Sequence, residues 1–221
     1  MVSHLGARVI LEVPKSLLDL LTDLEGVTEL VAKGDELPTF DYHCPLLSLP
    51  LAFKTDIDSI PASNAYLAAN PGKVLEWRAR LGDSSKPRIG LVWNGNPEHP
   101  DDSARSILLS EFVKLMSSEF QYVCLQNEIR EADKEPLSLH SEVLCYAEEI
   151  RDFADTAALC ELVDVVIGVD TSLVQVRLVS RCGYCCRLIQ IGVGCWIGAI
   201  VLGIPVPGST NRLQWGVERR N

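Results

Sequence analysis

The chain has 221 residues, of which 47% are hydrophobic and 23% are charged, and its formal net charge at pH 7 is −10. This composition is typical of a globular protein with one large domain or two smaller ones, and it excludes disorder over the whole chain. The negative charge argues against nucleic-acid binding, because an acidic surface repels a phosphate backbone.

The charge is divided unevenly along the chain. Residues 1–176 hold 29 acidic and 14 basic side chains, net −15, whereas residues 177–221 hold one acidic and six basic side chains, net +5. The tail also carries four of the eight cysteines, and its Cys182-x-x-Cys185 spacing lacks the further ligands that a zinc site needs. We expect the other four, Cys44, Cys124, Cys145 and Cys160, to be small core thiols of a cytoplasmic protein.

The first part of the chain predicts short, alternating elements. Residues 7–13 and 27–31 are rich in β-branched side chains and predict strands, and residues 15–24 between them predict a helix. Residues 40–50 predict a buried loop and strand, and residues 54–64 a connector. Residues 71–81 have helical spacing.

A second unit begins at Pro87. Residues 88–93, 120–125 and 163–169 predict buried strands. Residues 108–116 and 156–162 predict helices, the second with Asp155 as its N-cap. Strands that alternate with helices at this spacing favour a parallel sheet, in which ligands bind beyond the carboxyl ends of the strands.

Polar clusters follow the three strands of this unit: Asn94–Asn96, Gln126–Glu128 and Asp170–Ser172. Hydroxyls and backbone N–H groups where a helix follows a strand suit a phosphate, although ordinary capping and turn chemistry explains the same residues. Arg105 can neutralise a diphosphate, or it can pair with Asp101 or Asp102. The sequence contains no Walker loop, no G-x-G-x-x-G and no Ser/His/Asp set.

Taken together, these segments resemble the glycosyltransferase region of bacterial tetratricopeptide-repeat proteins. That region is related to heptosyltransferases (glycosyltransferase family 9) and more distantly to O-linked N-acetylglucosamine transferases. The resemblance covers about residues 5–174 and is carried, in order, by residues 5–14, 40–50, 90–97, 105–107, 151–159 and 169–172.

The resemblance implies an α/β, GT-B-like fold with two Rossmann-like parallel-sheet domains, both incomplete. Residues 1–70 would be a remnant of the acceptor-side domain, 71–86 a linker helix, and 87–176 a truncated nucleotide-sugar-binding domain. The family's first strand and glycine-rich loop would precede Leu5, so the acceptor side is expected to be truncated.

The resemblance also implies a reaction and a site. A sugar would pass from a nucleotide-diphosphate sugar to a glycan or protein acceptor, without a metal or other cofactor. Asn94, Asn96 and Arg105 would line the diphosphate, Gln126 would lie near the nucleoside, and Asp170, Thr171 and Ser172 would meet the phosphates. No catalytic residue is assigned.

Residues 177–221 depart from the family. Codons compatible with residues 190–205 permit D-W-R-W-L-L when read one nucleotide earlier, and this is a segment the family carries. The resemblance therefore implies a reading-frame change near codons 174–178. We expect the displaced segment to leave an edge of the sheet open, and the chain to be poorly soluble and to have little or no transferase activity.

Two alternatives remain. The chain can be a non-catalytic binding or scaffold remnant of a repeat protein, or residues 188–207 can form a tail anchor, since they are 20 mostly apolar residues. Under the principal interpretation no membrane association is expected.

Overall fold

The computed structural model describes residues 2–56, 58–60, 67–100, 102–169 and 171–172, together with the backbone of residues 187–191. In this part of the chain the strands form two parallel sheets. The larger has the order β5-β4-β3-β6-β7 and the smaller pairs β1 with β2. The strands are β1 Ile10–Val13, β2 Glu29–Ala32, β3 Arg88–Val92, β4 Gln121–Cys124, β5 Val143–Leu144, β6 Val165–Val169 and β7 Arg187–Ile191.

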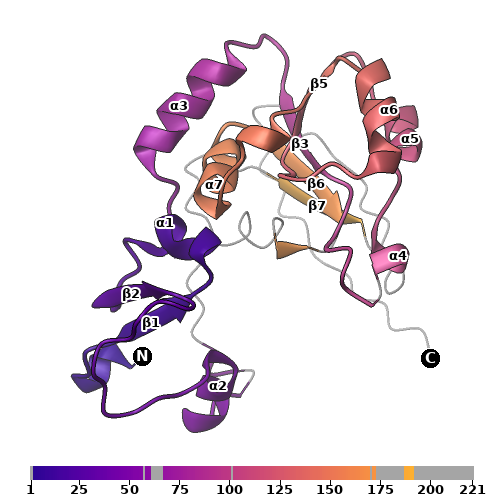
Figure 1. The fold of residues 1–221 in the computed structure, drawn as a ribbon. Helices are drawn as coiled ribbons and strands as arrows, with labels where there is room; N and C mark the ends of the chain where they lie inside the picture. Colours follow the sequence, from indigo (N-terminus) through magenta and orange to yellow (C-terminus); the bar gives the residue numbers. More distant parts are fainter. Residues whose placement is uncertain are drawn as a thin grey trace.

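Helices flank the larger sheet on both faces. In Figure 1, α3 and α7 lie on one side of it and α5 and α6 on the other. The α-helices are α1 Leu18–Leu21, α2 Leu49–Ala52, α3 Pro71–Leu81, α4 Asp102–Arg105, α5 Leu109–Phe112, α6 Glu131–Leu139 and α7 Phe153–Glu161. The fold of the described residues is therefore α/β with parallel sheets, as the sequence predicts.

Alternate residues of each strand enter opposite cores. On β3, Leu91 packs with Leu109 and Phe112 of α5, whereas Val92 packs with Trp77 of α3 and the α7 side. On β4 and β6 the side chains alternate between the two cores in the same way. Because both faces are covered, these strands read as continuous apolar runs rather than as polar–apolar alternations.

The N-terminal unit packs against α7. Leu20 of α1 and Leu67 lie in one buried cluster with Ala154 and Ala157 of α7. The charged side chain of Lys73 on α3 reaches the same helix and lies 3.0 Å from Asp155 Oδ1 and 3.1 Å from Asp152. Helix α7 therefore contacts the N-terminal unit through an apolar cluster and helix α3 through ion pairs.

The structure corrects three predictions. Residues 40–50 are not buried: Tyr42 is 95% and Leu47 96% exposed, Cys44 is exposed as well, and the segment leads into α2 rather than a strand. Helix α7 begins at Phe153, and its N-cap is Asp152, not Asp155. The side chain of Asp155 is buried and accepts a hydrogen bond from Trp77 Nε1 instead.

The third correction concerns the sheet edge. We expected the edge beyond β6 to be unpaired, but β7 pairs with it in parallel register from Val165↔Arg187 to Val169↔Ile191. This strand belongs to the segment 177–221, whose other residues lie outside those that the structure describes.

Candidate functional site

A pocket of about 230 Å³ lies at the carboxyl ends of β3, β4 and β6. All three polar clusters that the sequence predicts at strand ends contribute to it. Its lining consists of Asn94, Gly95, Asn96, Pro97, Gln126, Asn127, Glu128, Arg130, Phe153, Thr171 and Ser172. Parallel strands bring residues far apart in sequence to one edge, and this is where α/β sheets bind ligands.

Gly95 lies at the centre of the loop that follows β3, and its backbone is held on both sides. Its N–H donates to Ser106 Oγ at 3.0 Å, and its carbonyl accepts from Arg130 at 3.0 Å. A Cβ at this position would lie 3.0 Å from the Arg105 guanidinium and 3.1 Å from Asp102 Oδ1. The loop backbone therefore rests directly on a charged cluster, and a side chain at position 95 would require the Arg105 or Asp102 side chain to shift by a few tenths of an ångström.

The charged cluster contains two arginines and one carboxylate. Arg130 lies 2.8 Å from Asp102, and Ser106 Oγ donates to the other oxygen of Asp102, also at 2.8 Å. Burial alone raises the pKa of Asp102, but the hydrogen bonds from Ser106 and Arg130 and the nearby charge of Arg105 outweigh it, so the pKa falls below its ordinary value. Asp102 is therefore ionised at neutral pH and the cluster keeps a net positive charge.

Arg105 does not line the pocket, but it lies against the pocket's loop. Its guanidinium approaches the Gly95 position, and its Nε is buried without a hydrogen-bond partner among the described residues. A buried donor of this kind is uncommon in native structures. The sequence allowed Arg105 either to neutralise a diphosphate or to pair with Asp101 or Asp102. Arg105 lies close enough to Asp102 for its charge to lower the pKa of that carboxyl, and Asp101 lies outside the described residues.

Gln126 and Asn94 use their side chains to fix the shape of the pocket. Gln126 Oε1 accepts from the backbone N–H groups of Trp93 at 2.7 Å and Asn94 at 2.9 Å. The Asn94 amide donates to buried Asp133 at 2.7 Å, and Trp93 Nε1 donates to the same carboxylate oxygen at 3.0 Å. Both residues therefore line the pocket as parts of its frame.

The remaining predicted residues lie at the rim. Asn96 is exposed, and its side-chain oxygen accepts from the N–H of Glu98 at 3.0 Å, which is the turn chemistry weighed as an alternative. Thr171 and Ser172 both line the pocket, whereas Asp170 lies outside the described residues.

Arg130 was not predicted from the sequence, although it lines the pocket and contacts both the Gly95 carbonyl and Asp102. It lies four residues beyond Gln126, and a short turn returns it to the strand ends. The sequence feature that could have indicated Arg130 is its position: it is the basic residue that ends the largely polar segment 126–130, directly before helix α6.

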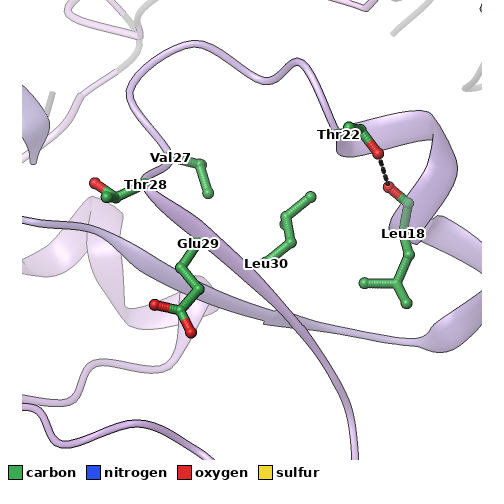
Figure 2. Close-up of a pocket in the computed structure, with 6 residues that line it drawn as sticks. All are labelled: Leu18, Thr22, Val27, Thr28, Glu29 and Leu30. Carbon is green, nitrogen blue, oxygen red and sulfur yellow. Dashed lines mark hydrogen bonds between the residues drawn. The ribbon is translucent and has the colours of Figure 1, made fainter.

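A second pocket, also of about 230 Å³, lies in the N-terminal unit between α1 and β2 (Figure 2). Leu18, Val27 and Leu30 line it, and its Thr22 hydroxyl donates to the Leu18 carbonyl at 3.0 Å. Its one ionisable side chain, Glu29, is paired with Arg8. This pocket therefore has a mixed polar and apolar lining, and two of its polar side chains, Thr22 and Glu29, already have partners within the chain.

The described residues contain no helix that is both long and apolar enough to cross a membrane. They also contain no group of three or more His, Cys, Asp or Glu side chains placed to hold a metal ion. The candidate tail anchor, 188–207, falls mostly outside the residues searched.

The chain was compared with known proteins. It is 27% identical over 143 residues to Protein FlbA of Caulobacter vibrioides, an alignment that covers 62% of this chain and 24% of FlbA. The chain thus spans about a quarter of the length of this curated relative. No protein-family model matches the chain, and no solved structure is significantly similar to it.

Proposed function

We propose that the pocket binds the diphosphate of a nucleotide-diphosphate sugar and that the chain is derived from a GT-B-type glycosyltransferase of the heptosyltransferase-related group. The observation that carries this proposal is the pocket itself, which gathers polar groups from the ends of β3, β4 and β6 around a net positive cluster. The fold supports it because nucleotides bind at this edge of parallel α/β sheets.

The charges of the cluster suit an anion. Arg130 lines the pocket and pairs with Asp102, and Arg105 adds a second positive charge behind the Gly95 loop, so the three side chains keep one net positive charge beside the pocket. Guanidinium groups hold phosphate oxygens in two-pronged contacts, and the hydroxyls of Thr171 and Ser172 lie on the same pocket. In a sugar transfer these groups would stabilise the charge that develops on the departing diphosphate.

The size of the pocket limits which part of the donor it holds. Sites for drug-sized ligands commonly enclose about 300–1,000 Å³. The described walls enclose about 230 Å³, which suits a diphosphate with an adjacent ribose better than a complete nucleotide sugar. The proposal therefore assigns this pocket to the diphosphate part of the donor.

Isothermal titration calorimetry with UDP, ADP, GDP and CDP tests the proposal. We expect at least one of them to bind and the Arg130→Ala variant to bind it about tenfold or more weakly, since a charge-assisted hydrogen bond contributes about 1.5–3 kcal/mol. Lys114→Ala is the matched control, because it removes one positive charge from an exposed side chain that pairs with Glu111 outside the pocket. Equal affinities for the two variants would contradict the proposal.

The same titration separates the enzyme from the binding remnant. Each nucleotide that binds is then offered as its sugar conjugate, and sugar release is followed by chromatography. The frame-restored chain is used for this step, because the present chain is expected to have little or no transferase activity. Binding with turnover by the restored chain supports a transferase, whereas binding without turnover by the restored chain favours the non-catalytic remnant. The absence of binding to all four nucleotides would reject the nucleotide site and would favour a scaffold remnant that keeps only partner contacts.

A further inference from the structure

Two cysteines lie side by side at the carboxyl ends of neighbouring strands. Strand β4 pairs with β5 in the register Tyr122↔Val143 and Val123↔Leu144, so the next pair in this register is Cys124 and Cys145. Residues of equal register in a parallel pair point to the same face of the sheet. The packing agrees, because buried Cys124 belongs to the core on the α5 face and Cys145 packs against that core.

The environments of the two thiols differ. Cys124 is fully buried, and its Sγ lies 3.8 Å from the carbonyl oxygen of Gln126, whereas Cys145 is partly exposed. A hydrogen bond from Cys124 lowers the pKa of Cys145 to about 7, although burial and the charge of Glu148 oppose this. Burial raises the pKa of Cys124, and the charges of Cys145 and Asp133 add to the effect. Cys145 is therefore the sulfur of the pair that a solute can reach, and the lowered pKa belongs to this sulfur.

We propose that Cys145 is a peroxide-reactive thiol and that Cys124 is its resolving partner, so that hydrogen peroxide or an alkyl hydroperoxide closes a disulfide across β4 and β5. The inference rests on strand register, on packing in one cluster and on the difference in accessibility between the two sulfurs. It is independent of the nucleotide proposal.

The chemistry balances in two steps. The Cys145 thiolate attacks the terminal oxygen of the peroxide, so an S–O bond forms and the O–O bond breaks; hydroxide leaves from hydrogen peroxide and an alkoxide leaves from an alkyl hydroperoxide. The Cys124 sulfur then attacks the sulfenic sulfur, so an S–S bond forms, the S–O bond breaks and the departing hydroxide takes the Cys124 proton as water. The two sulfurs together give two electrons to the peroxide.

The geometry of the strands permits this bond. Adjacent strands lie about 4.7–4.9 Å apart, and disulfide-linked residues have Cα atoms about 4.4–6.8 Å apart. Cys145 directly follows β5, a two-residue strand at the edge of the described sheet. A backbone shift that brings the two sulfurs within bonding distance would therefore fall on β5, which has a neighbour on one side only. Cys160 lies in the core of the opposite face and Cys44 is exposed in the N-terminal unit, so neither competes for Cys145.

Peptide mapping of the full-length chain tests the proposal. Trypsin places Cys124 and Cys145 in separate peptides, 115–130 and 135–151, each with no other cysteine. The chain is treated with hydrogen peroxide, alkylated, digested without reductant and analysed by mass spectrometry. We expect the two peptides to lose their thiols in parallel and to appear as one cross-linked species, which a reductant abolishes.

Cysteine variants and a denatured sample show which results would contradict the proposal. In Cys124→Ser, Cys145 is expected to accumulate as a sulfenic acid that dimedone traps, and Cys145→Ser should leave the Cys124 thiol intact. Cys44→Ser is the matched control and should form the same cross-link as the unmodified chain. The proposal is overturned if Cys124 and Cys145 react independently, or if the cross-link forms equally well in guanidinium chloride, where strand register is lost.

Discussion

The carboxylate of Asp133 is 1% exposed and accepts hydrogen bonds from Trp93 Nε1, the Asn94 amide and the Leu109 backbone N–H. It thereby ties the loop after β3 to the start of α5. At the residue scale, the pocket owes its shape to this second layer of contacts, because Asn94 is oriented by Asp133 rather than by a ligand. A change beneath the pocket should therefore alter both stability and affinity.

We predict that Asp133→Ala lowers the free energy of unfolding by about 3 kcal/mol or more, since it leaves several buried donors without an acceptor. It should also weaken nucleotide-diphosphate binding, because the loop that carries Asn94 loses its support. Urea denaturation and calorimetry measure the two effects. Asp83→Ala removes an exposed carboxylate and should change neither; equal effects in both variants would refute the role of Asp133.

Gly90 on β3 marks a second close approach. A Cβ there would lie 2.7 Å from Leu125 Cδ1 and 3.3 Å from Val163 Cγ2. We predict that Gly90→Ala destabilises the protein by about 1–3 kcal/mol through overpacking. Leu125→Val removes the Cδ1 methyl group that collides with the added Cβ. In a double-mutant cycle, the double variant should therefore recover part of the lost stability. Strictly additive effects would show that the collision is not the cause.

At the scale of elements, α3 and α7 are joined by a buried ionic network. Burial opposes ionisation of Asp155, but hydrogen bonds from Trp77, the Arg151 backbone and Lys73 lower its pKa. Burial likewise opposes ionisation of Lys73, but Asp155 and Asp152 raise its pKa. The two shifts have opposite signs, so they stabilise the helix pair between an acidic and an alkaline limit.

This network predicts the pH dependence of stability. A lowered carboxylate pKa stabilises the fold above the unfolded value of about 3.9, and this stability is lost as pH falls through the folded pKa. The raised pKa of Lys73 stabilises the fold below about 10.4, and this stability is lost as pH rises through the folded value. Asp155→Asn should flatten the acid limb and Lys73→Met the alkaline limb of urea midpoints measured against pH. Unchanged limbs would contradict the assignment.

The sequence predicted the strands of the larger sheet more accurately than the segments between them. Residues 88–92, 121–124 and 165–169 are buried on both faces, so their apolar runs identify them directly. Residues 40–50 misled the prediction because Tyr42 and Leu47 are apolar yet exposed, and composition alone does not distinguish a core from an uncovered surface.

The same reasoning applies to the candidate site. The strand ends located Asn94, Gln126 and Thr171 at one pocket, because parallel topology brings them together. The sequence did not reveal that Gln126 accepts hydrogen bonds from backbone N–H groups or that Asp152 caps α7, since both depend on the direction of a side chain. Arg130 enters the site through the turn after Gln126, and sequence periodicity does not define that turn.

At the scale of the whole molecule, the segment 177–221 contributes strand β7 to the larger sheet, where it pairs with β6. We propose that a one-nucleotide change near codons 174–178 displaced the family's last elements, and we predict that a frame-restored chain melts more cooperatively and stays more soluble than the present one. Calorimetry and sedimentation compare the two chains, after the gene has been re-sequenced across this region. A present chain that is soluble and melts in one sharp transition would contradict the prediction.

The packing of the N-terminal unit on α7 also has a consequence for synthesis on the ribosome. Leu20 belongs to one cluster with Ala157, so its partner leaves the ribosome only after most of the described chain has been made. At about 5–20 residues per second, this delay is on the order of 10 s. During that interval α1 and α3 have no α7 to cover their apolar sides, and the nascent chain should be most dependent on chaperones then.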